Sequence, residues 1–268
     1  MIILIPMGGK GSRFTDAGYV TNKACIETTD RHSGNILPMI LCAMKDIPGI
    51  DDQQNKIICV DRPFHEENGT ENIILNKYGN TTFIHDHVML DQAFGCFLAR
   101  EFLDSDDELF IGACDNGMDI DLDTFNNLKT TSDAIMISHT NDQNIFENPE
   151  AHSWAELDPL NSRITHISIK KTISDNAMND HATTGMFWFK NARTFLHYLE
   201  EMIWNKDTLD GKYYVDKVLQ YYVDSSKVVT YCDVNYLCWG TPMDYENYEK
   251  TIAYWKDFYE EEPWTKEK

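Results

Sequence analysis

Short apolar runs rich in β-branched residues alternate with amphipathic stretches along the first half of the chain. The apolar runs predict strands at residues 2–6, 56–60, 82–85, 108–114 and 133–139. The stretches between them predict helices at residues 36–46, 64–77, 91–103 and 122–129. Alternation of this kind indicates βαβ units, and therefore a mostly parallel sheet with helices on both faces.

In the second half of the chain, the predicted strands and helices no longer alternate one by one. Strands are predicted at residues 153–157, 163–170, 184–189 and 228–232, and helices at residues 192–204, 213–223 and 245–260. We find no internal repeat and no low-complexity linker between the halves. We therefore expect one Rossmann-like α/β domain over residues 1–268, with a mixed, mostly parallel central sheet flanked by helices and a change of character near residue 140.

The chain is strongly acidic. Its 268 residues include 44 Asp and Glu against 23 Lys and Arg, which gives a formal net charge of -21. This charge repels DNA, RNA and anionic membranes over most of the surface, so none of these is expected as a partner. The simplest interpretation of the acidity is that it keeps the protein soluble. A protein this acidic binds phosphate groups only through local cations, backbone N–H groups or a bound metal ion.

Cysteines and histidines form no evident cluster in the sequence. The seven cysteines are scattered without a C-x-x-C pair and mostly lie in apolar runs, which is typical of reduced, buried thiols in a cytoplasmic protein. His85 and His87 share a predicted strand face, but no third ligand is evident, so no zinc site is predicted. The apolar N-terminus is too short for a signal peptide, and no apolar run approaches the ~20 residues of a membrane span.

A glycine-rich segment follows the first predicted strand directly. Its residues 7–14 read Met-Gly-Gly-Lys-Gly-Ser-Arg-Phe. Glycines in a tight turn let backbone N–H groups approach a phosphate closely, and Arg13 adds a bidentate cation. The segment matches neither the Walker loop nor the dinucleotide-binding G-x-G-x-x-G pattern. On its own it equally suits a turn that only connects a strand to a helix.

An acidic residue follows the buried strand predicted at residues 108–114. Asp115 would lie at the carboxyl end of a parallel strand, where open α/β sheets bind their ligands. The nearby Asp119 and Asp121 are interpreted as a solvated turn residue and a helix cap.

The glycine-rich segment and a lysine ten residues beyond it resemble the sugar-phosphate nucleotidyltransferases, which have a GT-A-type, Rossmann-like fold. The matching residues are Gly8, Gly9, Gly11, Ser12, Arg13 and Lys23. The proline that precedes the family lysine is Asn22 here. The resemblance implies that these residues bind a nucleoside triphosphate, and that Arg13 and Lys23 offset the charge on the leaving pyrophosphate. Residues 1–140 would then form the nucleotide-binding half.

The resemblance extends to a base-binding and a metal-binding position. Gln92 matches an amide that reads a base edge, although Asp91 stands where the family usually has glycine. The other interpretation of Gln92 is an exposed residue at a helix N-terminus. Asp115 resembles the aspartate that holds Mg²⁺, or Mn²⁺ in its place, and its hard oxygen atoms suit that ion.

The remaining likeness lies in residues 141–268, which would form the acceptor-binding half and a C-terminal helix. Thr184 and Gly185 resemble a Thr-Gly pair that lines the acceptor site, and Lys170 matches a lysine that holds the acceptor phosphate. The glutamate that precedes this lysine in the family is Ile169 here.

The segment 239–245, Trp-Gly-Thr-Pro-Met-Asp-Tyr, resembles the turn that closes the family's site. Many members carry a second metal-binding aspartate two residues before its glycine, and this chain has Cys238 there. Asp233 is the nearest substitute, although its spacing does not match.

The resemblance implies an enzyme that condenses a nucleoside triphosphate with a sugar 1-phosphate, giving a nucleotide-activated sugar for polysaccharide biosynthesis and pyrophosphate. One alternative is a cytidylyltransferase for a non-sugar phosphate or phosphonate acceptor, which the loss of the glutamate at Ile169 favours. Another is an inactive nucleotide-binding or scaffold protein on the same fold, against which the presence of Arg13, Lys23 and Asp115 together argues. The sequence leaves the base, the acceptor and the oligomeric state open.

Overall fold

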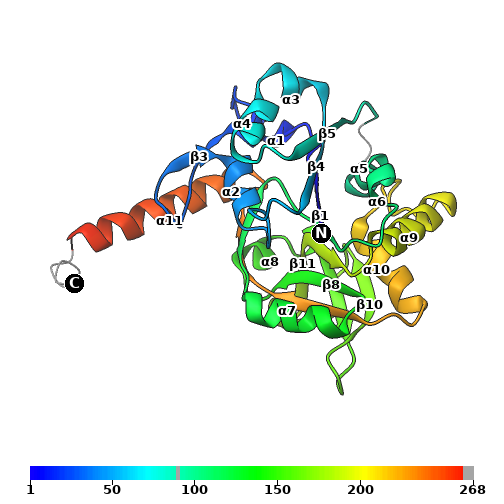
Figure 1. Ribbon diagram of the computed structural model, residues 1–268. Helices are drawn as coiled ribbons and strands as arrows, with labels where there is room; N and C mark the ends of the chain where they lie inside the picture. The colour runs from blue at the N-terminus through cyan, green and yellow to red at the C-terminus, as the bar shows by residue number, and fades with distance from the viewer. Residues whose placement is uncertain (89–90, 262–268) are drawn as a thin grey trace.

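The computed structural model describes residues 1–88 and 91–261 (Figure 1). Among these residues, nine strands form one mixed sheet whose main path runs in the order β10-β9-β11-β6-β1-β4-β5, with β8 between β11 and β12. The strands are β1 (Ile2–Pro6), β4 (Lys56–Asp61), β5 (Thr81–His85), β6 (Leu109–Ile111), β8 (Ala134–His139), β9 (Ser153–Leu157), β10 (Ile164–Ile169), β11 (His181–Phe189) and β12 (Val229–Asp233). The expected mixed α/β fold is confirmed.

The two halves of the sheet differ in strand direction. β1, β4, β5 and β6 pair in parallel, so their carboxyl ends lie at one edge of the sheet. β11 runs antiparallel to β6, β8 and β9, and β9 and β10 form an antiparallel pair. The long strand β11 therefore joins the parallel half of the sheet to the antiparallel half.

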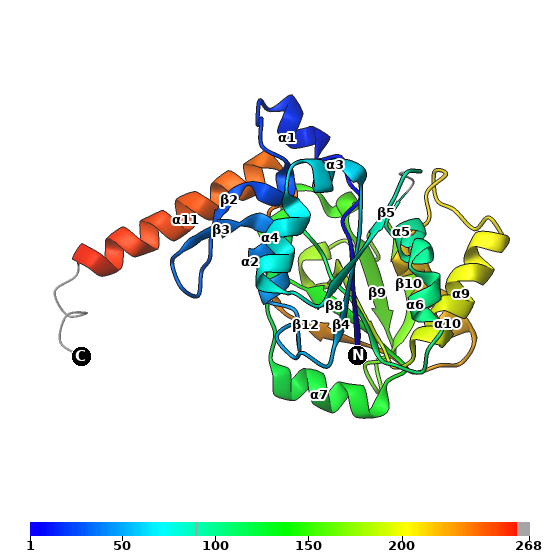
Figure 2. The same cartoon turned by 45° about the horizontal axis from the view of Figure 1, so that its top comes forward.

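Alternating side chains of β1 enter two separate cores, one on each face of the sheet. Ile2 and Leu4 belong to one core, and Ile3 and Ile5 to the other. The first core is covered by α5 (Gln92–Leu98), α6 (Arg100–Leu103), α9 (Ala192–Trp204) and α10 (Val215–Asp224). The second is covered by α2 (Met39–Lys45), α4 (Thr70–Lys77) and α7 (Leu122–Thr131). Figures 1 and 2 show these two groups of helices on opposite sides of the sheet.

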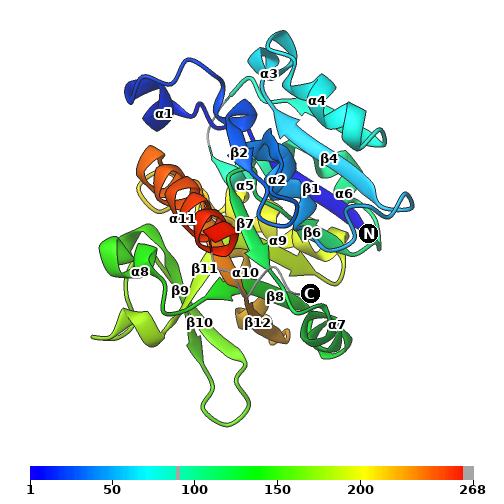
Figure 3. The same ribbon diagram turned by 90° about the vertical axis from the view of Figure 1, so that its left-hand side faces the viewer.

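A third, smaller apolar cluster joins the two ends of the described chain. It contains Phe14 from α1 (Ser12–Asp16), Met39 from α2, and Tyr248 from the C-terminal helix α11 (Pro242–Glu261). Two short two-stranded antiparallel sheets lie nearby: β2 (Glu27–Thr29) with β3 (Ile36–Pro38), and β7 (Asn116–Asp119) with β13 (Asn235–Cys238). Figure 3 shows α11 beside β2 and α2, and Figures 1 and 2 show its far end extending away from the sheet.

The remaining helical segments are short. They are α3 (Pro63–Glu67), α8 (Gln143–Glu147) and the 3-10 turns η1 (Lys23–Cys25), η2 (Pro149–Ala151) and η3 (Ala177–Asn179).

Several predicted elements were wrong in extent, and four of them are shorter or divided. Residues 36–38 extend as β3, so the helix predicted at 36–46 begins only at Met39. Gly69 has a positive φ of 76° and divides the helix predicted at 64–77 into α3 and α4. The helix predicted at 91–103 divides at Ala99, and the strand predicted at 108–114 ends at Ile111. Apolar periodicity continues across such breaks and does not reveal them.

No helix among the described residues is long and apolar enough to cross a membrane. All seven cysteines are free thiols.

Candidate functional site

The glycine-rich segment leaves β1 at the carboxyl edge of the parallel strands. Gly11 has a positive φ of 65° and begins the five-residue helix α1. A Cβ atom at this position would lie 3.0 Å from the Lys23 Cβ, so the backbone conformation and the close approach both favour glycine. A Cβ atom on Gly8 would lie 3.2 Å from the Asp86 Oδ2. The loop is thus packed closely against Lys23 on one side and Asp86 on the other.

Lys23 and Asp115 form an ion pair between two segments that are 92 residues apart. The Lys23 Nζ lies 2.5 Å from the Asp115 Oδ2 and also donates to the Gly240 carbonyl at 3.1 Å. The side chains are 16% and 33% exposed, respectively. Burial alone would lower the pKa of Lys23, but the Asp115 carboxylate outweighs it and the pKa is raised. Lys23 is therefore charged at neutral pH.

The loop and Asp115 line a cleft of about 720 Å³, which we call the loop cleft. Its cations are Lys10, Arg62 and Lys212. The lining also includes Gly8, Gly9, Ser12, Asp86, Asp91, Gln92, Cys114 and Asp115. A cleft at the carboxyl ends of parallel strands, with glycine backbone and three cations in its wall, has the chemistry needed to bind a polyphosphate.

A second cleft of about 750 Å³, which we call the sheet cleft, adjoins the first and shares Asp91 and Gln92 with it. Lys170, Thr183, Thr184 and Gly185 line it, together with Arg13, Glu147, His152, Tyr213, Tyr214, Asp216, Tyr236, Cys238, Gly240, Thr241 and Asp244. The sequence placed Arg13 with the loop residues, but the exposed Arg13 side chain lines this second cleft.

Lys170 is held in a strained position at the end of β10. Its φ is +59°, a conformation that non-glycine residues rarely adopt. Its ammonium group hydrogen-bonds the Ala151 carbonyl and lies 5.6 Å from the centre of the Tyr214 ring. Burial lowers the pKa of Lys170, and the nearby Asp216 carboxyl partly opposes this effect. A strained, half-buried lysine facing a cleft favours a role in binding an anion.

Gln92 and the pair Thr184–Gly185 link the two clefts. Gly185 has a φ of 80° and lies where the β11–β8 register shifts, so β11 bulges at this point. The Gln92 side-chain amide donates to the Gly185 carbonyl at 3.0 Å, and Asn116 donates to the Thr184 carbonyl at 3.2 Å. The bulge is therefore tied to both the helix α5 and the residue after Asp115.

Asp91 also connects the two clefts. One oxygen caps α5 by accepting the Phe94 N–H at 2.8 Å, and the other accepts the Tyr213 N–H at the same distance. Asp91 thus holds the start of α5 against the loop that leads into α10.

The turn that precedes α11 closes the sheet cleft beside Lys23. Thr241 and Asp244 cap each other reciprocally, with the Thr241 N–H donating to the Asp244 Oδ2 at 3.1 Å and the Asp244 N–H donating to the Thr241 Oγ1 at 3.2 Å. The Cys238 thiol lies 3.5 Å from the same Asp244 oxygen. Burial, with the Asp244 charge, raises the pKa of Cys238 to about 12, so this side chain is a neutral thiol.

Asp233 lies apart from these residues. Its Oδ1 accepts from the Ser138 hydroxyl at 2.7 Å and lies 2.9 Å from the His181 Nδ1. It lines neither cleft among the described residues. Its position as the last residue of β12 does not favour a metal-binding role shared with Asp115.

Sequence analysis missed several residues that line the clefts. Arg62, Lys212, His152 and Asp216 belong to no motif, and Lys10 was given no role. Only Lys10 gave a usable signal, because it stands inside the glycine-rich segment. Of the two nearby aspartates interpreted from the sequence, Asp121 does cap α7, by accepting the Asp123 N–H at 3.1 Å. Asp119 instead pairs with Arg31, with 2.6 Å between the Arg31 Nη2 and the Asp119 Oδ1.

Comparison with known proteins identifies the fold. No protein-family model matches the chain, and no curated protein sequence matches it either. Among solved structures, it is similar to the nucleoside-diphosphate-sugar pyrophosphorylase from Vibrio cholerae RC9, with a TM-score of 0.74 and 16% identity over 92% of this chain and 99% of the other.

Two further structures show the same likeness. One is a UDP-glucose pyrophosphorylase in complex with UDP-glucose, with a TM-score of 0.69 and 13% identity over 96% of this chain and 98% of the other. The other is the inositol-1-phosphate CTP transferase from T. maritima, with a TM-score of 0.62 and 18% identity over 94% of this chain and 95% of the other. The chain therefore has the fold of these nucleotidyltransferases along nearly its whole length.

Proposed function

We propose that the protein is a nucleotidyltransferase that joins a nucleoside triphosphate to a small phosphorylated acceptor, with release of pyrophosphate. The observation that carries this proposal is that two clefts of similar size adjoin at Asp91 and Gln92, and that Lys23 bonds to a residue of each. Lys23 contacts Asp115 in the loop cleft and the Gly240 carbonyl in the sheet cleft. The Lys23–Asp115 pair therefore connects the walls of the two clefts.

The loop cleft suits the nucleoside triphosphate. Backbone N–H groups of the glycine-rich loop and the cations Lys10, Arg62 and Lys212 supply positive potential in an otherwise acidic protein. Gln92, at the start of α5, has its amide nitrogen bound to the Gly185 carbonyl. Its carbonyl oxygen remains the acceptor that we assign to a base edge.

The residues present fit a magnesium ion. Asp115 presents a hard carboxylate at the carboxyl edge of the parallel strands, and Lys23 pairs with its Oδ2, so an ion would bind through Oδ1 or replace the ammonium group. Mg²⁺ commonly takes one or two protein carboxylates and completes its shell with phosphate oxygens and water, so Asp115 alone is sufficient. When bound there, Mg²⁺ or Mn²⁺ would neutralise phosphate charge in the transition state.

The chain's own residues position the reacting groups and balance their charge. In the proposed reaction, a phosphate oxygen of the acceptor attacks the α-phosphorus in line, and the bond to pyrophosphate breaks. An acceptor phosphate is a competent nucleophile at neutral pH, so the protein needs no side-chain nucleophile. Lys23 stabilises the charge on the leaving pyrophosphate. Lys170 holds the acceptor phosphate, and Arg13, on the same cleft, adds a second cation to that side.

The acceptor is a sugar 1-phosphate in the first form of this proposal and a non-sugar phosphate or phosphonate in the second. The observation that favours the second is the position of Ile169, which packs against the main apolar core and lines neither cleft among the described residues. No carboxylate can therefore reach sugar hydroxyls from that position. Glu147 and Asp216 line the sheet cleft and offer carboxyl groups from other segments.

A pyrophosphate-release assay tests both forms. CTP, UTP, dTTP and GTP are each offered with glucose 1-phosphate, inositol 1-phosphate, phosphocholine or a phosphonate. Turnover with one triphosphate and one acceptor class is the expected result, and Asp115→Asn is the matched inactive control. If the protein binds triphosphates but releases no pyrophosphate with any acceptor, the proposal fails and the inactive scaffold is supported.

A further inference from the structure

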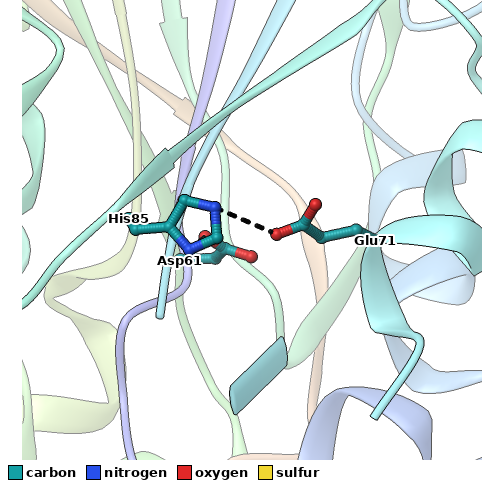
Figure 4. A group of neighbouring side chains, drawn as sticks. All are labelled: Asp61, Glu71 and His85. Atoms are coloured by element: carbon teal, nitrogen blue, oxygen red, sulfur yellow. Dashed lines mark ion pairs between the residues drawn. The ribbon is translucent and has the colours of Figure 1, made fainter. Parts of the chain in front are cut away.

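Asp61, Glu71 and His85 converge at the outer edge of the sheet (Figure 4). Asp61 and His85 are the last residues of β4 and β5 and face each other in the parallel register, whereas Glu71 comes from the first turn of α4. One ligand atom from each residue lies within 4.8 Å of the other two. The sequence suggested no partner for His85, because its neighbours here are 24 and 14 residues away.

The Asp61 carboxyl group is completely buried and lacks a hydrogen bond. Its side chain is 0% exposed, and neither oxygen has a hydrogen-bond partner among the described residues. His65 lies nearby, but its Nδ1 accepts the Arg62 N–H and therefore does not donate to Asp61. A buried carboxyl group in such surroundings needs a cation or a proton.

The spacing and chemistry of the three groups suit a metal ion. The His85 Nε2 lies 3.4 Å from the Glu71 Oε1, its Nδ1 lies 3.9 Å from the Asp61 Oδ1, and the His85 and Glu71 side chains remain 30% and 15% exposed. One ring nitrogen therefore faces each carboxyl group, and an ion bound by all three residues would take one of these two nitrogens. Two atoms that each bind a tetrahedral Zn²⁺ at ~2.0–2.1 Å are separated by about 3.3–3.4 Å. One imidazole with two carboxylates is a ligand set typical of Zn²⁺ and neighbouring transition metals, whereas Mg²⁺ and Ca²⁺ prefer oxygen atoms alone.

We propose that Asp61, Glu71 and His85 bind a divalent transition-metal ion, with Zn²⁺ as the probe, at a site separate from Asp115. The ion would join α4 to the carboxyl ends of β4 and β5. Arg62 and Asp86, which line the loop cleft, directly follow Asp61 and His85 in the chain. Thr70, which directly precedes Glu71, accepts a hydrogen bond from Asn22 at 3.1 Å, beside Lys23. The site would thus stabilise one wall of the loop cleft, whatever reaction the cleft supports.

The competing explanation is a proton shared by the two carboxyl groups. Burial, together with the charge of Glu71, raises the pKa of Asp61 to about 8, so a protonated Asp61 would also relieve the buried charge. Asp61→Asn separates the two cases, because an amide resembles a protonated carboxyl group in shape but does not replace a carboxylate as a metal ligand. Under the shared-proton explanation this variant keeps the thermal stability of the parent.

The experiment uses the full chain with Asp115→Asn, chelator-treated and without triphosphate, so that the magnesium position plays no part. Zn²⁺ is added, binding is measured by calorimetry, and the thermal midpoint is followed. We expect one Zn²⁺ per chain, a raised midpoint, and no such response to Mg²⁺. Glu71→Gln and His85→Ala should each weaken Zn²⁺ binding at least ~10-fold. His87→Ala is the matched control, since His87 is exposed and its ring centre lies 6.5 Å from that of His85.

Two results would overturn the proposal. The first is no Zn²⁺ binding by the parent, with an unchanged midpoint in Asp61→Asn. The second is Zn²⁺ binding that survives in both Glu71→Gln and His85→Ala, which would place the ion elsewhere. Co²⁺ provides the independent readout: an absorption spectrum without a thiolate charge-transfer band supports the Asp61 cluster, whereas such a band identifies a cysteine site and contradicts it.

Discussion

The loop cleft and the sheet cleft are built in different ways, although they adjoin and have similar volumes. The loop cleft is formed mainly where parallel strands end, so its glycine-rich loop and Asp115 follow β1 and β6 closely in the chain. The sheet cleft is formed by antiparallel strands, a bulge in β11, and the loops before α10 and α11. Contiguous motifs therefore describe the loop and the Asp115 side of the first cleft, whereas its other cations and the whole second cleft depend on contacts between distant segments.

The two clefts also differ in charge. In the loop cleft, three cations (Lys10, Arg62 and Lys212) balance three carboxyl groups (Asp86, Asp91 and Asp115). In the sheet cleft, Arg13 and Lys170 stand against four carboxyl groups (Asp91, Glu147, Asp216 and Asp244). A polyphosphate needs several cations or backbone N–H groups, and an acceptor with one phosphate needs a single cation and polar partners for the rest of the molecule. The difference in charge supports assigning the triphosphate to the loop cleft and the acceptor to the sheet cleft.

The largest effect is expected from Asp115→Asn. Losing this carboxylate removes the proposed metal ligand and the partner of Lys23, so kcat should fall at least ~10²-fold, the scale for losing one electrostatic stabiliser. Pyrophosphate release measures the loss, and excess chelator should abolish the parent activity. Asp123→Asn is the control, because this exposed residue lies in the first turn of α7. Full activity of Asp115→Asn would show that the Lys23–Asp115 pair is not a catalytic centre shared by the two clefts.

Lys170→Met should affect the acceptor alone and so separate the clefts functionally. A hydrogen bond to a charged group contributes about 1.5–3 kcal/mol, so the KM for the acceptor should rise about 10- to 100-fold. The dissociation constant for the triphosphate should stay unchanged. Lys171→Met is the matched control, because its side chain is exposed and lines neither cleft among the described residues. A weaker triphosphate affinity in Lys170→Met would show that the assignment of the clefts is wrong.

The pH dependence of acceptor binding should report the same lysine. Burial lowers the pKa of Lys170, so its positive charge is lost at a lower pH than in an exposed lysine. The KM for the acceptor should therefore rise as the pH is increased through this lowered pKa. Initial rates of pyrophosphate release between neutral and alkaline pH measure the effect. If the acceptor KM of Lys170→Met changes with pH in the same way as that of the unaltered protein, Lys170 is not the cause of the pH dependence.

Asp91→Ala tests how much the contact between the start of α5 and the loop before α10, which line both clefts, stabilises the protein. This change removes the cap of α5 and the bond to the Tyr213 N–H, so the free energy of unfolding should fall by about 2 kcal/mol. Urea unfolding measures it. Asp91→Asn keeps an oxygen that can cap α5, and should lose about half as much. Equal losses in the two variants would show that the cap contributes nothing.

The smallest effect is expected from Cys238→Ser. The raised pKa keeps Cys238 a neutral thiol beside Asp244, so it offers no charge to either cleft at neutral pH. A hydroxyl of similar size should change kcat/KM by less than about threefold. A loss comparable to that of Asp115→Asn would instead show that the thiol acts directly at the Lys23–Asp115 centre.

The sequence by itself predicted the alternation of strands and helices, the α/β class and the cluster of the glycine-rich loop with Lys23 and Asp115. The first two features depend on local periodicity, and the loop and Asp115 each follow a predicted strand, whereas Lys23 was linked to them only by the resemblance to a known family. The breaks at Gly69 and Ala99 were not predicted, because apolar spacing continues across them. The positions of Arg13 and Asp233 relative to the clefts were equally inaccessible, since side-chain direction depends on packing.

Only the tertiary structure brought together residues that share no pattern. Asp216 and Lys170 meet in the sheet cleft because α10 packs against β10, and Gln92 reaches Gly185 because β11 bulges. Asp61, Glu71 and His85 converge because two parallel strands end side by side beneath α4. Local sequence patterns record the neighbours of a residue along the chain. Contacts across a sheet depend on strand order and register, which the whole core determines.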